Sequence, residues 1–108
     1  MKDLLTGKQK RFLRSRAQTI KAIFQLGKNG LSDAFAQQVV DALERRELLK
    51  ISLLQNSDVD LDEAAEFLQK FDPTIEVAQK IGRVLVLYRP AHKKENRRLS
   101  PQVKALVA

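Results

Sequence analysis

The sequence has 108 residues, which suits one domain with a single core, and it has no cysteine, which excludes disulfides, thiol chemistry and cysteine metal sites. Residues 1–6 hold no apolar signal core and the longest uninterrupted apolar run is Val84 to Tyr88, so we expect a cytoplasmic protein that is neither secreted nor membrane-spanning. The net charge of +7 is segregated: residues 1–31 and residues 80–108 each hold eight basic residues against one acid, whereas residues 32–79 hold eleven acids against four bases. If the two ends meet in the fold, they form a positive face, whose usual partner is a polyanion.

The first predicted helix runs from about Gly7 to Ala17 and is strongly basic. Thr6 and Gln9 have the spacing of a capping box, and apolar residues such as Leu13 give the helix one apolar side. No acid lies within one turn of its five cations, so intrahelical salt bridges do not explain them. A solvated helix face is the plain alternative, but unpaired cations in this number favour phosphate contact, through Lys8, Lys10, Arg11, Arg14 and Arg16.

A glycine loop, Gly27-Lys28-Asn29-Gly30, follows the first predicted strand, residues 21–26, and precedes a helix capped by Ser32. Two glycines permit positive φ and leave the backbone open to a ligand. A strand-to-helix junction also directs unpaired N–H groups and the positive helix end toward an anion, and Lys28 and the preceding Lys21 add charge. Loops with this spacing clamp nucleic-acid backbones, although a plain turn is the alternative from these four residues alone.

The remaining pattern predicts an α/β fold with the order α-β-α-β-α-β-β. The helix after the loop ends near Arg45-Arg46, residues 48–54 form a strand, and a helix from about Asp60 ends at Asp72-Pro73. Residues 74–79 and 84–89 form the last two strands. Crossover helices make the first three strands parallel, whereas the short connection at residues 80–83 makes the last pair an antiparallel hairpin. We expect one mixed four-stranded sheet, with the glycine loop at the carboxyl end of its first strand, where such sheets bind ligands.

The composition changes after Pro90. Residues 92–98 hold four basic residues and no large apolar one, so they predict a mobile basic arm. Ser100-Pro101 then resembles the N-cap and first position of a two-turn helix that reaches Val107. So short a helix docks on the body, frays or engages a partner.

No group of residues in the sequence assembles a catalytic or metal site. Gly27-Lys28 lacks the first glycine and the Ser/Thr of a nucleotide-binding Walker loop. The acids from Asp58 to Asp62 imitate a calcium loop, but the glycine and the final glutamate of such a loop are absent. His92 is the only histidine and falls in the tail. We therefore predict no enzyme activity, no cofactor, no metal and no small-molecule substrate.

The cations of the first helix, together with Lys21 and Lys28, are expected to line one surface, joined by Arg83 and Arg89. Exposed aromatics are scarce, because the phenylalanines fit core positions and Tyr88 ends a buried strand. This argues against a base-stacking platform and for recognition of the backbone and shape of structured RNA.

Three spaced blocks carry a family resemblance that covers about residues 4–90. The blocks are Leu5-Thr6-Gly7-Lys8-Gln9-Lys10-Arg11-Phe12-Leu13-Arg14, then Gln25-Leu26-Gly27-Lys28-Asn29-Gly30-Leu31, then Ile81-Gly82-Arg83 with Leu87-Tyr88-Arg89-Pro90. They resemble the CRM domain, the chloroplast RNA splicing and ribosome maturation domain, in its stand-alone bacterial form, the YhbY family.

The resemblance implies a fold like the C-terminal domain of translation initiation factor 3, RNA binding through the glycine loop and neighbouring basic surface, and association with precursors of the large ribosomal subunit. It assigns the loop role to Gly27, Lys28, Asn29 and Gly30 and backbone contact to Lys8, Lys10, Arg11 and Arg14. Gln18-Thr19 and Ala22 stand where the family often has His and Pro.

The sequence thus predicts an RNA-binding domain over residues 1–90 and a basic tail over residues 91–108. The predicted function is a monomeric, non-enzymatic protein that binds ribosomal RNA during large-subunit assembly. Two alternatives stay open: a regulator of splicing or messenger RNA that uses the same surface, and a protein-interaction adaptor that works through the helix from Ser100 to Val107.

Overall fold

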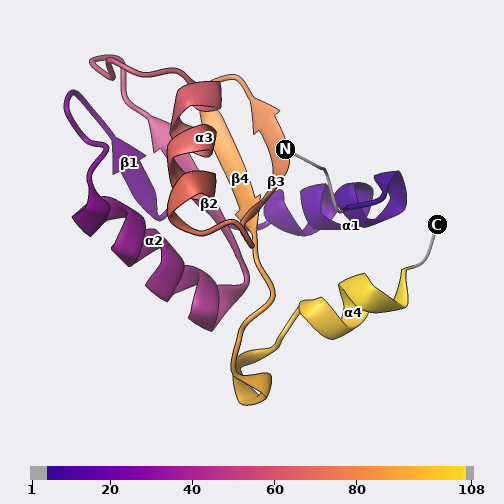
Figure 1. The fold of residues 1–108 in the computed structure, drawn as a ribbon. Coiled ribbons are helices and arrows are strands. Elements are labelled where there is room, and N and C mark those ends of the chain that lie inside the picture. Colours follow the sequence, from indigo (N-terminus) through magenta and orange to yellow (C-terminus); the bar gives the residue numbers. More distant parts are fainter. Residues whose placement is uncertain (1–4, 107–108) are drawn as a thin grey trace.

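The computed structural model describes residues 5–106, so Val107, where the predicted C-terminal helix ends, lies outside the described residues. Figure 1 shows the elements in chain order. They are α1 (Gly7–Ala17), β1 (Phe24–Leu26), α2 (Asp33–Arg46), β2 (Leu48–Leu53), α3 (Leu61–Phe71), β3 (Glu76–Ile81), β4 (Val84–Tyr88), the 3₁₀ turn η1 (Lys94–Asn96) and α4 (Ser100–Ala105).

The four strands form one sheet in the order β1-β2-β4-β3. Strand β1 pairs parallel with β2, Phe24 opposite Ile51, whereas β4 is antiparallel to both of its neighbours. Strands β1, β2 and β3 therefore run the same way, and the predicted α-β-α-β-α-β-β order and mixed four-stranded sheet are confirmed. Strand β3 begins and ends two residues later than predicted, because residues up to Ile75 still belong to the turn after α3, and a bulge lies between Val77 and Gln79.

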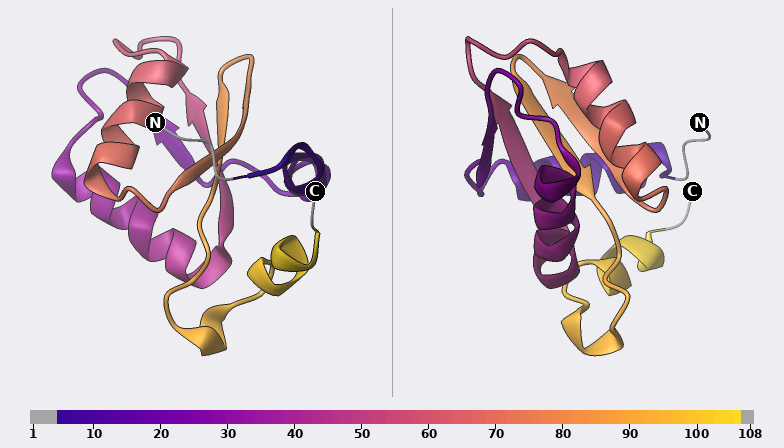
Figure 2. Two further views of the ribbon diagram at one scale, coloured as in Figure 1. Left: turned by 45° about the vertical axis from the view of Figure 1, so that its right-hand side comes forward. Right: turned by 60° about the vertical axis from the view of Figure 1, so that its left-hand side comes forward.

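Helices cover both faces of the sheet, as Figure 2 shows. On one face, α2 and α3 pack on inward residues of the strands such as Leu49, Ile51 and Leu87. On the other face, α1 and α4 pack around Val86 and Tyr88. Neighbouring residues on one strand thus point into two different cores, which is why the strands are apolar on both faces.

The helix starts follow the sequence closely. The Thr6 hydroxyl accepts from the N–H of Gln9 at 3.1 Å and the Gln9 side chain accepts from the N–H of Thr6 at 2.9 Å, which is the predicted capping box. Ser32 caps α2 and Asp60 caps α3 in the same way as predicted. The cap at Ser32 fixes where α2 begins, and so it limits the glycine loop to the residues between Leu26 and Ser32.

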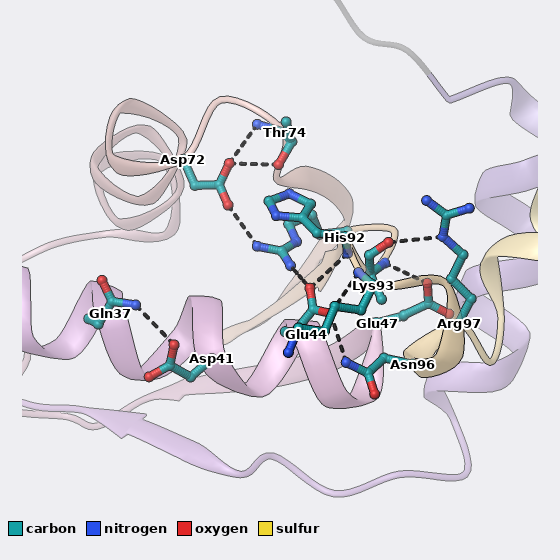
Figure 3. Close-up of polar contacts among 12 residues, drawn as sticks. Gln37, Asp41, Glu44, Glu47, Asp72, Thr74, His92, Lys93, Asn96 and Arg97 are labelled. Atoms are coloured by element: carbon teal, nitrogen blue, oxygen red, sulfur yellow. Dashed lines mark hydrogen bonds and ion pairs between the residues drawn. The ribbon is translucent and has the colours of Figure 1, made fainter.

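The tail is held against the body, so the prediction of a mobile arm over residues 92–98 is wrong. Two carboxylates at the end of α2 hold it, as Figure 3 shows for Glu44 and Glu47. Glu44 accepts from the backbone N–H of His92 and Lys93 and from the Asn96 amide, at 2.7, 3.0 and 2.8 Å. Glu47 is completely buried and accepts from four tail N–H groups, those of Ala91, Arg98, Leu99 and Ser100.

Helix α4 then docks on α1, where the Gln9 amide donates to the carbonyl of Val103 at 2.9 Å. Leu99 occupies the N-cap position and Ser100 begins the helix, one residue from the predicted cap. The two basic ends of the chain therefore lie side by side (Figure 2).

We expect the tail to detach in acid. Burial alone raises the pKa of Glu47, but the hydrogen bonds from Ala91, Ser100 and Arg98 outweigh it and lower the pKa to about 2. The Asn96 amide, partly opposed by burial and helped by the His92 and Lys93 N–H groups and by Arg89, lowers the pKa of Glu44 to about 2. Because both pKa values are depressed in the folded state, their stabilisation is complete above about pH 4.5 and is lost as the pH falls toward 2, about 3 kcal/mol for Glu47.

The measurement is denaturant unfolding at pH 7, 4 and 3, with hydrogen exchange of the Arg98 to Ser100 amides. Glu47→Gln should be less stable at pH 7 and should depend less on pH, whereas the exposed Glu95→Gln should behave as the parent protein does. Equal pH dependence in all three proteins would contradict this role of Glu47.

Candidate nucleic-acid interface

The glycine loop lies at the carboxyl end of β1, an edge strand of the sheet (Figure 1). The N–H of Gly30 donates to the carbonyl of Gly27 at 3.2 Å, which closes a tight turn. Within this turn the left-handed residue is Asn29, at φ 58°, and neither glycine has positive φ. The prediction that the glycines are there to supply positive φ is therefore wrong, because asparagine tolerates this conformation.

Close packing instead restricts both glycine positions, and most strongly that of Gly30. A Cβ on Gly30 would overlap Cδ1 of Leu26 and lie 3.0 Å from the carbonyl oxygen of Gly27. A Cβ on Gly27 would lie 3.1 Å from Oδ1 of Asn56. Lys28 and Asn29 at the tip are exposed, so the loop presents a short stretch of backbone and one ammonium group to solvent.

One loop amide already has an anionic partner. The N–H of Asn29 donates to Oδ1 of Asp58 at 3.2 Å, and both residues are exposed. The expectation of unpaired N–H groups in this loop is therefore wrong for Asn29. Because the N–H of Asn29 already donates to a carboxylate at the surface, it points outward and an anion can reach it.

The basic residues of α1 lie on the face of the sheet opposite α2 and α3 (Figure 2). Lys8, Arg11 and Arg16 are exposed, and Lys10 and Arg14 are half-buried. Within residues 5–106, no carboxylate forms an ion pair with Lys8, Arg11, Arg14 or Arg16. No carboxylate of the described residues therefore competes with a phosphate for these four cations.

Lys21 and Arg83 are two further exposed residues that the sequence assigned to this surface. Lys21 is exposed on the segment that joins α1 to β1. Arg83, in the turn between β3 and β4, is at the same end of the sheet as the glycine loop, and its guanidinium donates to the carbonyls of Leu53 and Leu54. Since Leu54 in turn contacts the Gly27 position, Arg83 supports the loop as well as adding charge next to it.

Arg89 does not belong to this surface. Its side chain is 1% exposed, and it forms ion pairs with Glu44 at 2.5 Å and Asp72 at 3.0 Å. A buried guanidinium with two carboxylates has no free face for a phosphate. The prediction that Arg89 lines the surface is wrong: it joins α2, the end of α3 and β4 in the interior.

Asp58 is the residue at this site that the sequence patterns did not reveal, because in the sequence it stands out only as part of an incomplete calcium-loop pattern.

Within the described residues no group of three potential metal ligands is placed to hold a metal ion. Tyr88 is buried, as expected for a core position. No helix among residues 5–106 is long and apolar enough to cross a membrane.

Comparison with known proteins defines the class. Residues 5–89 match the CRS1 / YhbY (CRM) domain, and the chain belongs to that family. It is 47% identical over 96 residues to "Probable RNA-binding protein YqeI" of Bacillus subtilis (strain 168), covering 89% of this chain and 97% of the relative. It is 32% identical over 97 residues to an "RNA-binding protein" of Haemophilus influenzae, covering 81% of this chain and 87% of that one.

Among solved structures, the fold is similar to the solution structure of the hypothetical protein SAV1595 from Staphylococcus aureus. The TM-score is 0.64 at 39% sequence identity, over 88% of this chain and 98% of the other. The family resemblance predicted from the three sequence blocks is thus confirmed. The expectation of a protein without enzyme activity agrees with the names of these relatives.

Proposed function

We propose that this protein is a non-enzymatic RNA-binding protein that acts as a monomer in the cytoplasm on the ribosomal RNA of large-subunit precursors. The observation that carries the proposal is the set of cations on α1 without counter-charge, connected through Lys21 and β1 to an exposed glycine loop. The names of the relatives support RNA as the ligand.

The distribution of charge favours one side of the molecule. The two basic ends of the chain meet where α4 contacts α1, whereas acids gather at the start of α3, in Asp60, Asp62 and Glu63. A polyanion is therefore attracted to α1, whereas Asp58 and the acids at the start of α3 oppose its approach beside the glycine loop. Neutralisation of phosphates by α1 supplies most of the affinity, and Lys28 with the adjacent backbone fixes the position of the strand.

Recognition of the backbone agrees with the aromatic residues that the structure describes. Tyr88 is buried, and Phe24 and Phe35 pack edge to face at 5.8 Å between ring centroids within the core. Base stacking would need exposed rings along the basic side. Phe71 is exposed, but it ends α3, away from α1.

Crosslinking in cells, followed by sequencing of the attached RNA, tests the proposal. Precursor large-subunit RNA should dominate, and the protein should co-sediment with incomplete large subunits. Enrichment of introns or messenger RNA would favour the alternative regulator instead. Loss of all function on deletion of residues 91–108, with RNA binding intact, would favour the adaptor.

The contact between Asp58 and the loop makes a specific prediction for this mechanism. A phosphate that approaches the N–H of Asn29 meets the carboxylate of Asp58, which is hydrogen-bonded there at 3.2 Å. Asp58→Asn removes that like charge, so RNA affinity should increase by about fivefold, on the order of 1 kcal/mol for an exposed charge pair. Fluorescence anisotropy with a large-subunit RNA fragment measures it.

Glu66→Gln is the matched control, because Glu66 is an exposed acid on α3 and its loss changes the net charge equally. Its affinity should stay within twofold of the parent. Equal affinities for the Asp58 and Glu66 variants would show that phosphate does not approach this loop.

A further inference from the structure

A second basic site lies at the other end of the sheet. A groove of about 500 Å³ opens between the ends of α1 and α2, the start of β2 and the tail. Four arginines from three parts of the chain line it, together with Thr19 and Leu48: Arg16, Arg45, Arg46 and Arg98. Only Arg16 is part of the surface predicted from the sequence.

The acids nearest in sequence to this groove are engaged elsewhere. Both oxygens of Glu47 accept from backbone N–H groups of the tail, and Glu44 pairs with Arg89 and Asn96. Within residues 5–106, none of the four arginines forms an ion pair with a carboxylate. Four exposed guanidinium groups thus line one groove with no carboxylate partner among the described residues.

Helix stabilisation explains only part of this cluster. Arg45 and Arg46 occupy the last turn of α2, where cations favour the helix dipole. Arg98 donates from Nε to the carbonyl of Arg45 at 3.0 Å and so satisfies a free carbonyl at that helix end. The dipole supplies about half a negative charge, however, and Arg16 comes from a different helix. The rest of this positive charge lies at the surface, because all four arginines are exposed, and it attracts an external anion.

The distance between the groove and the glycine loop, with cations between them, indicates that the anion is an extended polyanion. The groove opens beside Leu48, the first residue of β2, whereas the glycine loop follows Leu26, which pairs with Leu53, the last residue of β2. Five strand steps separate them, about 17 Å. A second hollow, lined by Lys21, Ile23 and Arg46, adjoins the groove on the β1 side, and Ile23 is 40% exposed there. The cations therefore follow a line from the groove past Lys21 to the edge strand that carries the loop.

We propose that the arginine groove binds a second stretch of RNA sugar-phosphate backbone, so that one RNA is held at both ends of the sheet. This rests on the proposed function and extends it. Guanidinium groups bind phosphate oxygens in a bidentate manner, and a groove lined by four of them accommodates more than one phosphate.

The test is the salt dependence of RNA binding by Arg45→Gln/Arg46→Gln, measured with a fluorescein-labelled large-subunit RNA fragment. If both arginines contact phosphate, the slope of log K against log salt falls by about two, and affinity at 0.1 M salt falls on the order of 50-fold. The control is Lys70→Gln/Lys94→Gln, which removes the same charge from exposed positions outside the groove and should leave the slope within half a unit.

The outcomes separate the groove from the proposed function. If the slope is steep in the parent and equally steep in the arginine variant, RNA does not bind in the groove, but the proposed RNA binding by the protein stands. A parent slope near zero overturns both.

A second measurement does not depend on removing arginines. Because the chain has no cysteine, Thr19→Cys places a unique thiol in the groove for a photocrosslinker. The control is Glu66→Cys, on the exposed side of α3. We expect RNA adducts from position 19 at least tenfold above those from position 66, and equal yields would overturn the groove.

Discussion

Between 50 and 200 mM salt, the affinity of this protein for large-subunit RNA is expected to fall by about 10³-fold to 10⁵-fold. The reason is that six to ten phosphate contacts release as many counterions, and the unpaired cations of α1 with Lys21, Lys28 and the arginine groove reach about that number. Anisotropy titrations at five salt concentrations measure the slope directly.

The matched variant for this prediction is Lys8→Gln/Arg11→Gln, which removes two exposed cations of α1. Its slope should be lower by about two than that of the parent. A tenfold or smaller change in affinity for the parent protein over this salt range would show that phosphate contacts do not dominate binding.

Replacement of the buried arginine, Arg89→Met, is expected to destabilise the protein by about 3–5 kcal/mol, which lowers the Tm by roughly 15–30 °C. The substitution leaves Glu44 without its charged partner and Asp72 without the hydrogen bond at 3.0 Å from Nη1. The pKa of Asp72, which burial raises, is held below its ordinary value by Thr74 and Arg89 together, and it should rise in the variant. Denaturant and thermal unfolding at pH 7 measure the loss.

Arg11→Met is the control, because Arg11 is exposed and its replacement should change stability by less than about 0.5 kcal/mol. The two variants should also differ in their affinity for RNA. At a temperature where Arg89→Met remains folded, its affinity should match that of the parent, whereas Arg11→Met should bind more weakly. Full stability of Arg89→Met with weakened RNA binding would return Arg89 to the interface.

Local chemistry predicted the elements well because their signals are short in range. The caps at Thr6 and Ser32 both formed, and β2 and β4 lie within one residue of their predicted bounds, 48–54 and 84–89. The order β1-β2-β4-β3 could not be read in the same way. Pairing of β2 with β4 joins residues more than thirty positions apart, and crossover rules set strand direction without setting adjacency.

The errors at the site also arose because the contacts concerned join residues that are far apart in the sequence. Arg89 follows a strand and precedes a proline, which is typical of an exposed position, and its partners Glu44 and Asp72 lie 45 and 17 residues away. The tail has few apolar residues, but Glu44 and Glu47 on α2 supply hydrogen bonds that a composition argument does not count. Asp58 reaches the loop from the segment after β2, 29 residues beyond Asn29.

The packing of the glycines also limits which variants can test the loop. A side chain on Gly30 overlaps Leu26, so its replacement would weaken the fold and the binding together. Lys28 is exposed at the tip, and among the described residues its side chain forms no hydrogen bond or ion pair, so Lys28→Gln isolates the charge of the loop.

The central claim is that α1 and the glycine loop bind the same RNA, with Lys21 on the segment that joins α1 to β1. Amide chemical-shift mapping of the labelled protein, titrated with a large-subunit RNA fragment, tests it most directly. The account predicts concerted shifts in Gly7–Ala17 and in Gly27 to Gly30, with Leu61–Phe71 unchanged. Shifts concentrated in α3, or shifts in α1 that leave the loop unaffected at saturation, would contradict it.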